Sequence, residues 1–353
     1  MTYRALLLTD TPEFSAQVTE LDTLPEGDVE LRIDYATLNY KDALALCNRS
    51  PIVRTWPMVA GIDAAGVVES SSHPDFRPGD AVVLNGWGLG ETRWGGLAQR
   101  TRAPGDWLVK LPVRSSRSPG RPKNDLAPSG GGSDVFPEPG VQMTPRDAAA
   151  IGTAGYTAAL CAQTLERHGL TPADGPILVT GATGGVGSIA IALLAGAGFE
   201  VHALTGKTAD HAYLKNLGAA KVLNRADFAA PGKPMQKERY AGVVDALGSH
   251  ALANACAQVK RDGAVAACGL AMGMDFPASV APFILRGIAL YGIDSVYASP
   301  ARRQAAWARL AEGLDAALLA GIGHEIGLSE VLPAAEKILA GQMTGRYIVD
   351  VNR

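Results

Sequence analysis

The sequence predicts an α/β fold in which a doubly wound parallel sheet stands beside a second, mostly antiparallel and partly barrel-like β domain. Short strands and turns alternate from residue 1 to about residue 112, as they do in antiparallel β domains. From Thr144 onward, short apolar strands are instead separated by segments of helix length, which is the pattern of parallel βαβ units. A chain of 353 residues is long enough for two domains with large cores.

The first domain has predicted strands at 3–8, 29–35, 66–69 and 81–84, the last of them after the turn Arg77-Pro78-Gly79-Asp80. No second nucleotide-binding motif occurs in this half. We place a substrate-binding β domain at residues 1–143, a dinucleotide-binding domain at 144–295, and a return of the chain to the first domain at 296–353.

The segment 113–139 fits neither domain, because it is rich in proline, glycine and serine and has almost no large apolar residues. Such a segment cannot bury enough surface to fold by itself, so we predict a flexible insertion. Its first half is basic, with Arg114, Arg117, Arg121 and Lys123. That charge could contact a phosphate or a partner, but the composition favours a solvated loop.

The second domain begins with a helix that has Thr144 as its N-cap and continues through Ala150, and a second helix follows from Gly155 through Leu165. Strands are predicted at 176–180, 199–204, 221–224, 242–246, 264–268 and 288–292. After Ser299 we expect one long alanine-rich helix and then a final strand at 347–351.

The stretch Ala182-x-Gly184-x-x-Gly187 follows the first of these strands and precedes an apolar helix predicted at 188–198. It is the dinucleotide fingerprint with alanine in place of the first glycine. Glycine at 184 lets a pyrophosphate approach the backbone, glycine at 187 lets helix and strand pack closely, and the helix N-terminus attracts phosphate. A tight turn without a ligand is the alternative. The complete strand, turn and helix context favours cofactor binding.

The identity of the cofactor is predicted from the end of the next strand, where NAD-binding proteins carry an acidic residue. Here the chain reads Thr205-Gly206-Lys207. A hydroxyl and a cation suit a ribose 2′-phosphate, so we predict NADPH. Asp210 is the nearest acid, and we interpret it as a helix N-cap or first-turn residue. Lys207 could otherwise be a solvated surface lysine.

Composition excludes several other classes of protein. A net charge of −3 gives no electrostatic basis for binding nucleic acid or an anionic membrane. The four cysteines are scattered without a CxxC pair, and the six histidines show no metal-ligand spacing. The apolar run at the N-terminus is too short for a signal peptide, and the glycine-rich stretch 182–199 is not a membrane span. We therefore expect a cytoplasmic protein without a metal or a disulfide framework.

Taken together, these elements resemble the zinc-free branch of the medium-chain dehydrogenase/reductase superfamily, and within it the acrylyl-CoA reductase family, near the quinone oxidoreductases. The resemblance runs through the whole chain except 113–139. The residues that carry it are 38–45 (LNYKDALA), 57–63 (PMVAGID), 86–91 (GWGLGE), 94–98 (WGGLA), 105–109 (GDWLV), 151–155 (IGTAG), 268–270 (CGL), 282–286 (PFILR), 292–295 (GIDS) and 341–346 (GQMTGR).

The resemblance implies a GroES-like catalytic domain, a homodimer and no metal ion. Gly61-Ile62-Asp63 stands where zinc-dependent relatives carry Gly-His-Glu, and Asn39 stands where they carry a cysteine. It also implies hydride transfer from NADPH to the β-carbon of a 2-enoyl thioester, with a proton reaching the α-carbon. An acyl-CoA substrate, acrylyl-CoA, is thus expected.

Several cofactor contacts follow from the same resemblance. The pyrophosphate would be held by Thr183, Gly184, Gly185 and Val186. The 2′-phosphate would lie among Thr205, Gly206, Lys207, Tyr213 and Arg225. The ribose and nicotinamide would contact Leu247, Leu270, Ile293 and Ser295, and Arg346 would lie near a phosphate. Tyr213 could instead be a core aromatic, Arg225 a surface charge, and the two leucines ordinary packing.

Tyr40 is the candidate to orient the substrate or relay a proton, and to contact the cofactor, with Asn39 and Asp42 beside it. A phenol near the nicotinamide could meet the charge that develops on an enolate oxygen. A water could donate the proton instead, and Asn39 and Asp42 could serve only to fix the loop. The alternative functions are an NADPH:quinone or enone reductase and a non-catalytic NADPH-binding protein.

Overall fold

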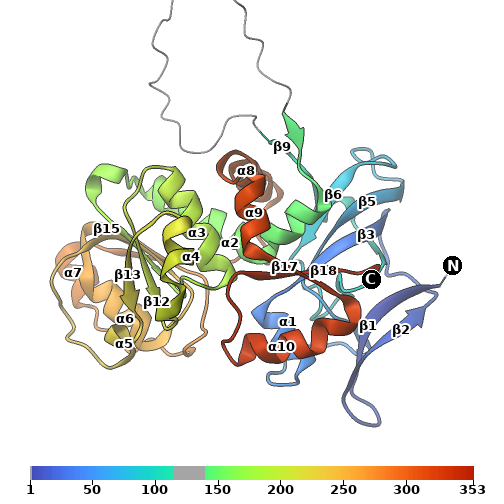
Figure 1. Ribbon diagram of the computed structural model, residues 1–353, viewed down its shortest axis with the longest axis horizontal. Coiled ribbons are helices and arrows are strands. Elements are labelled where there is room, and N and C mark those ends of the chain that lie inside the picture. The colour runs from blue at the N-terminus through green and yellow to red at the C-terminus, as the bar shows by residue number, and fades with distance from the viewer. Residues whose placement is uncertain (1, 115–139) are drawn as a thin grey trace, which may run out of the picture.

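The computed structural model describes residues 2–114 and 140–353, and it places two large sheets side by side with helix α2 (Pro145–His168) between them (Figure 1). One sheet is built from six parallel strands in the order β13-β12-β11-β14-β15-β16. These strands are β11 (Ile177–Thr180), β12 (Val201–Thr205), β13 (Ala219–Asn224), β14 (Tyr240–Asp245), β15 (Val259–Ala267) and β16 (Ala289–Gly292). This is the doubly wound order, so the predicted α/β fold class is confirmed.

Side chains alternate across the parallel sheet, as the two-residue period of a strand requires. Ile177 and Val179 are buried against α2 and the fingerprint helix, whereas Leu178 packs into a separate cluster on the other face. The helices connecting these strands are α3 (Gly185–Gly196), α4 (His211–Asn216), α5 (Ala226–Ala229), α6 (Ser249–Gln258) and α7 (Ala281–Arg286). Residues 187–194 of α3 are all buried, which confirms the prediction of an internal helix.

The second sheet combines the two ends of the chain. Its path is β17-β18-β3-β5-β6-β8, with β7 paired to β3, and every pairing is antiparallel except the one between β17 and β18. The strands are β3 (Val29–Leu38), β5 (Asp63–Ser71), β6 (Ala81–Asn85), β7 (Arg100–Ala103), β8 (Leu108–Lys110), β17 (Gly323–Gly327) and β18 (Arg346–Asp350). A smaller antiparallel sheet contains β1 (Tyr3–Thr9), β2 (Ser15–Leu21) and β4 (Met58–Val59).

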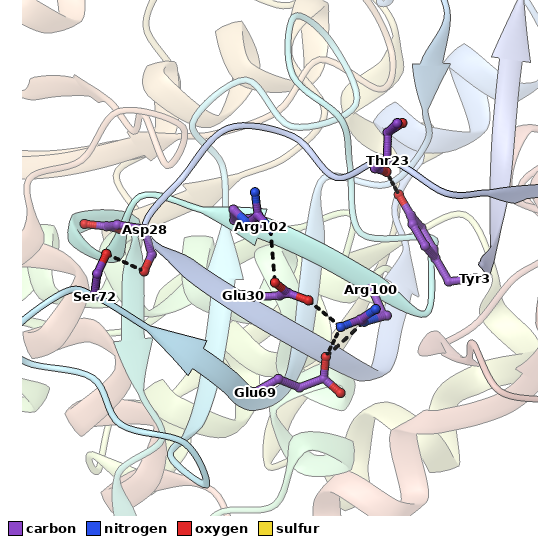
Figure 2. A network of polar contacts seen from close by, with 8 residues as sticks. All are labelled: Tyr3, Thr23, Asp28, Glu30, Glu69, Ser72, Arg100 and Arg102. Carbon is purple, nitrogen blue, oxygen red and sulfur yellow. Dashed lines mark hydrogen bonds and ion pairs between the residues drawn. The ribbon is translucent and has the colours of Figure 1, made fainter. Parts of the chain in front are cut away.

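A polar network crosses one part of this domain and joins strands β3, β5 and β7 (Figure 2). Arg100 donates to Glu69 at 2.9 Å through Nε and pairs with Glu30, while Arg102 reaches the other oxygen of Glu30 at 3.1 Å. Arginines of β7 therefore face glutamates of β3 and β5, and such opposite-charge pairs across neighbouring strands stabilise the sheet.

Helix α2 differs in detail from the two helices predicted for this region. Thr144 caps it as expected, accepting the Asp147 N–H at 3.1 Å. The break falls at Gly152, with φ 51° and ψ −165°, and Gly155 lies inside the second helical part. A side chain at 152 would meet the Arg346 guanidinium at 2.3 Å, so glycine is needed there for both conformation and space.

The alanine-rich tail is not one helix, which corrects the prediction. Ser299 starts α8 (Pro300–Gly313), but the chain leaves the helical region at Leu314, and Asp315 then caps α9 (Ala316–Ile322) by accepting the Leu318 N–H at 2.7 Å. A further helix, α10 (Val331–Leu339), packs on α1 (Tyr40–Leu46). Among the described helices, none combines the length and apolar character needed to cross a membrane. Short 3₁₀ turns occur at 105–107, 172–174, 208–210 and 328–330.

The predicted flexible insertion falls mainly on residues 115–139, which lie outside the described part of the chain. Its two flanks are strands: β9 (Val113–Arg114) pairs antiparallel with β10 (Val141–Gln142). The prediction that the insertion begins at Val113 is therefore corrected, because Val113 and Arg114 belong to this two-stranded ribbon.

Candidate cofactor-binding and active site

The turn between β11 and α3 shows why its two later glycines are present. A Cβ at Gly187 would lie 2.4 Å from the Gly181 carbonyl oxygen, so this position must be glycine for the helix to pack on the turn. At Gly184, φ is −81° and the nearest atom to a Cβ would be 3.2 Å away. A Cβ at 184 would therefore need only a small shift of its neighbour. The bare, exposed backbone of Gly184 at the start of α3 suits a bound phosphate group.

The predicted 2′-phosphate residues gather at the end of β12. The Arg225 guanidinium lies over Gly206, 2.9 Å from where a Cβ would be, and the Arg225 N–H donates to the Thr205 carbonyl at 2.8 Å. The Lys207 ammonium donates to the Met343 carbonyl and to Thr344 Oγ1. Burial lowers the pKa of Lys207. An anion beside the ammonium group would favour its charged form and so oppose that shift.

Asp210 and Tyr213 lie just beyond that strand end, and Asp210 is at a helix N-cap, as interpreted from the sequence. Asp210 occupies the N-cap position of α4, but its carboxylate makes no capping bond and accepts the Thr344 hydroxyl at 2.6 Å. The Tyr213 hydroxyl donates to Ser188 Oγ at 2.8 Å, and its ring packs on the core that contains α3. This position suits the core-aromatic interpretation of Tyr213.

A cluster of buried polar side chains lies where β3 enters α1. Asp42 accepts the Asn39 backbone N–H at 2.8 Å, and the Asn39 amide nitrogen lies 3.0 Å from Asp63 Oδ2. Asp63 also accepts the backbone N–H groups of Thr37 at 3.0 Å and Thr153 at 2.8 Å. The cluster therefore ties β3, α1, β5 and α2 to one another, so Asn39 and Asp42 do fix this loop.

Arg346 connects this cluster to the fingerprint turn. Its guanidinium donates to Asn39 Oδ1 at 3.2 Å on one side, and on the other side it lies 2.5 Å from where a Cβ of Gly185 would be. The side chain is buried, its Nε has no hydrogen-bond partner, and burial lowers its pKa. A buried guanidinium with one unpartnered N–H, next to the N-terminus of α3, fits the phosphates of a dinucleotide.

The carboxyl group of Asp42 is perturbed by its surroundings. Burial, followed by repulsion from Asp63, raises its pKa to about 7, and the hydrogen bonds from Asn39 oppose that shift. Asp42 is almost completely buried. It therefore lies behind the surface that a substrate can reach.

Tyr40, the next candidate, is the first residue of α1 and is 43% exposed. It lines an open groove of about 740 Å³ between α1 and α10, together with Leu44, Cys47, Arg49 and Leu332. The structure thus leaves its phenol accessible, while Asn39 and Asp42 hold the helix end from which it projects.

The residues predicted at the nicotinamide end are only partly brought together. Leu247 is buried beside Gly181, whereas Leu270 is 51% exposed and its Cα lies near Gly248. Ile293 donates its N–H to the Ala267 carbonyl at 2.9 Å, next to the end of β15. The Ser295 carbonyl accepts from the buried Arg303 guanidinium at 3.2 Å.

The sequence did not single out Asp63, Lys41 or Arg303 as site residues. Asp63 was considered only as evidence against zinc, although a carboxylate that begins an apolar strand is itself a signal. Lys41 pairs with Glu91 at 2.9 Å. Arg303 stacks on Trp87 and donates to four carbonyl groups at the junction of the two domains. Within the described residues, no three His, Cys, Asp or Glu side chains are grouped so that they could hold a metal ion.

Comparison with known proteins decides the family. Residues 25–113 match the alcohol dehydrogenase GroES-like domain, and residues 185–312 match the family described as zinc-binding dehydrogenase. A protein of Escherichia coli K12 described as "Probable acrylyl-CoA reductase AcuI" is 45% identical over 338 residues, which are 96% of this chain and 95% of that relative. The chain belongs to the acrylyl-CoA reductase-like family of the medium-chain dehydrogenase/reductase superfamily. It is an oxidoreductase, as predicted, and the expected GroES-like domain is confirmed.

Solved structures of this oxidoreductase family agree with the fold over nearly the whole chain. The E. coli K-12 YhdH structure with bound NADPH has a TM-score of 0.88 and 44% identity, covering 99% of this chain and 100% of that one. The Bacillus subtilis protein YhfP, described as a putative quinone oxidoreductase, is 40% identical over 96% of this chain and 95% of the relative. Its structure with NAD bound has a TM-score of 0.87 and 38% identity, covering 99% and 100%.

Proposed function

We propose that this oxidoreductase uses NADPH to reduce the 2,3 double bond of a short 2-enoyl-CoA, with acrylyl-CoA as substrate and propionyl-CoA as product. The observation that carries the cofactor assignment is the buried Arg346, whose Nη1 lies beside the start of α3 and whose Nε has no partner. The thioester substrate is supported by the relative described as an acrylyl-CoA reductase.

The cofactor would be held along the carboxyl ends of β11, β12, β14 and β15, where ligands bind in doubly wound sheets. When bound, NADPH supplies a hydride for the β-carbon of the substrate. The residues proposed to hold it are Thr183, Gly184, Gly185, Val186 and Arg346 at the pyrophosphate, Thr205, Gly206, Lys207 and Arg225 at the 2′-phosphate, and Leu247, Leu270, Ile293 and Ser295 at the ribose and nicotinamide. Tyr213 would support this site from behind, through Ser188.

Tyr40 is proposed to orient the substrate and to lie beside the α-carbon of the substrate, where the proton is added. Its phenol is accessible, and the cluster of Asn39, Asp42, Asp63 and Arg346 fixes the helix end that carries it. Donation by Tyr40 itself and donation by a water remain alternatives, and Tyr40→Phe separates them: direct donation predicts a loss of about 100-fold in kcat, whereas donation by water predicts little change.

Oxidation of NADPH by the purified protein tests the substrate class, with acrylyl-CoA, crotonyl-CoA and a simple quinone in parallel. We expect fast turnover with acrylyl-CoA. Preference for the quinone would support the second candidate, quinone reduction, which the description of YhfP favours. If the protein binds NADPH and turns over none of the three, both substrate assignments are overturned while the cofactor site stands.

The choice of NADPH over NADH is tested by removing the cations at the end of β12. We expect Lys207→Ala and Arg225→Ala to weaken NADPH binding by about 10-fold each, because each removes a charge-assisted bond to the 2′-phosphate, and to leave NADH binding unchanged. Lys221→Ala is the matched control, since Lys221 lies on β13 and faces Glu200 at 3.7 Å. Equal losses for both cofactors, measured by calorimetry, would contradict this assignment.

We further propose that the protein is a homodimer. Strand β16 forms an edge of the parallel sheet, and α7 beside it exposes Ile284 (74%) and Leu285 (57%). An open edge strand next to exposed apolar side chains favours pairing with a second copy.

A further inference from the structure

An ion pair joins the first turn of α1 to the loop between β6 and β7. Lys41 Nζ lies 2.9 Å from Glu91 Oε1, and only 33% and 20% of the two side chains are exposed. Glu91 is itself held by its backbone, since its carbonyl accepts the Arg54 N–H at 2.8 Å and its N–H donates to Gly88 at 3.1 Å. The ammonium group therefore has a fixed position at the surface of the catalytic domain.

Three consecutive residues of α1 point in three directions, because successive helical residues are about 100° apart. Asp42 faces the buried cluster with Asp63, and Tyr40 lines the groove beside α10. Lys41 points toward the loop that carries Glu91. Among the charged residues of this first turn, Lys41 is thus the one that lies outside both the buried cluster and the groove.

The loop that carries Glu91 lies at the junction of the two domains. Its Gly86 N–H donates to the Ile62 carbonyl at 3.2 Å, and its Trp87 N–H donates to the Val296 carbonyl at 3.0 Å. Val296 directly follows Ser295, which we have proposed at the nicotinamide end. The Lys41–Glu91 pair consequently bridges the helix of Tyr40 and a loop that is bonded to the segment next to the nicotinamide.

We propose that Lys41, aimed by Glu91, donates a hydrogen bond to the thioester carbonyl oxygen of the substrate and stabilises the enolate that forms there. This inference rests on the proposed function and names the residue that serves as the electrophile. An ammonium group has three N–H donors, so with one directed at Glu91 the others are free for the substrate.

The chemistry balances without any further reactant. A hydride from the nicotinamide cofactor, which is thereby oxidised, forms a C–H bond at the β-carbon, and the electrons of the C=C bond move onto the thioester oxygen. Lys41 stabilises that negative oxygen by a charge-assisted hydrogen bond and keeps its own protons. A proton from Tyr40 or water then adds to the α-carbon, and the carbonyl group re-forms.

The test compares Lys41→Met, Lys41→Arg and Glu91→Gln with the matched control Lys110→Met, whose lysine pairs with Asp80 at 2.8 Å on the same domain. We expect Lys41→Met to lower kcat for acrylyl-CoA by about 100-fold, the usual effect of removing one oxyanion donor. Lys41→Arg keeps the cation and Glu91→Gln keeps the ammonium, so both should lose less. Lys110→Met should match the wild type.

A second readout does not depend on turnover. The infrared carbonyl band of propionyl-CoA labelled with ¹³C at the thioester should move to lower frequency when it binds to the wild type and to Lys41→Arg. It should not move in Lys41→Met, even when that variant is saturated with ligand. A loss of folding alone would not produce this selective change in a bound ligand.

The outcomes separate the two proposals. If the wild type reduces acrylyl-CoA and Lys41→Met shows the same kcat and the same carbonyl band, the role of Lys41 is overturned while the function stands. If the wild type neither reduces acrylyl-CoA nor binds propionyl-CoA, the proposed function fails, and the role of Lys41 falls with it.

Discussion

At the scale of single residues, the buried cluster beside α1 contains more acidic than basic side chains. Two carboxylates, Asp42 and Asp63, face the single guanidinium of Arg346, and all three side chains are buried. Carboxylates that share a buried site resist ionisation, which agrees with a pKa of about 7 for Asp42. The stability of the protein should therefore respond to pH near neutrality.

We predict that Asp42→Asn becomes more stable relative to the wild type as the pH rises from about 5 to about 8.5. The folded-state pKa of about 7 lies above the ordinary 3.8, so the folded protein keeps a proton that the unfolded chain releases. That contribution is fully present below 3.8 and is lost as the pH rises through 7. Asparagine cannot ionise, so the free energy of unfolding of Asp42→Asn does not fall for this reason.

Urea unfolding at both pH values measures this difference in the free energy of unfolding. Asp80→Asn is the control, because hydrogen bonding to Lys110 lowers the pKa of Asp80 and removes its titration from this interval. Parallel pH dependences for Asp42→Asn and the wild type would contradict the prediction.

At the scale of single residues, the sequence predicted contacts only between residues that belong to one short motif. Asn39 and Asp42 were placed together beside Tyr40 and do lie together, whereas Arg346 was expected only near a phosphate and its contact with Asn39 was not predicted. Asp63 was not selected as a site residue, because its partners Thr37 and Thr153 lie far away in the sequence and come together only through sheet pairing and the break in α2. Roles that depend on long-range contacts cannot be deduced from local spacing.

At the scale of elements, the turn before α3 contains two glycines that are present for different reasons. Gly187 is required by its own chain, since a Cβ would lie 2.4 Å from the Gly181 carbonyl oxygen, whereas a Cβ at Gly184 would lie 3.2 Å from it and needs only a small shift. The sequence motif names both positions without distinguishing packing from ligand approach.

We predict that Gly187→Ser and Gly184→Ser have opposite phenotypes. Gly187→Ser should destabilise the protein by about 1–3 kcal/mol through overpacking. Gly184→Ser places a good N-cap residue at the helix start, so its stability should change by less than about 0.5 kcal/mol, while NADPH binding weakens. Thermal unfolding and calorimetric titration with NADPH test the pair. Loss of stability without loss of binding in Gly184→Ser would refute the distinction.

Element ends were predicted less well than element types, for a physical reason. The tail reads as one alanine-rich helix because helix propensity is high throughout. Its stop and restart depend on Gly313 and Asp315, two signals that lie only two residues apart. The interruption of α2 was predicted between Ala150 and Gly155, but its position at Gly152, beside the distant Arg346 side chain, was not.

The arrangement of the whole molecule leaves β16 and α7 as an open edge. We predict that Ile284→Lys converts a dimer to a monomer without lowering the thermal midpoint of the isolated subunit, because Ile284 is 74% exposed and contributes little to its own core. Val18→Lys is the matched control, since Val18 is a half-exposed residue of β2 in the other domain. Sedimentation of the wild type as a monomer, or of Ile284→Lys as a dimer, would rule out this interface.

The position of β18 in the sheet affects how the protein can be made. Residues 347–350 of β18 pair directly with β3, which contains residues 29–38, so the first domain to be synthesised lacks this internal strand until the whole parallel sheet has been translated. The parallel sheet, at 177–292, has all its strands earlier and can fold while the ribosome is still at work. Strand β18, which is translated after the parallel sheet, also brings Arg346 to the site. A chain terminated between the two is therefore left with a nucleotide fold but no completed active site.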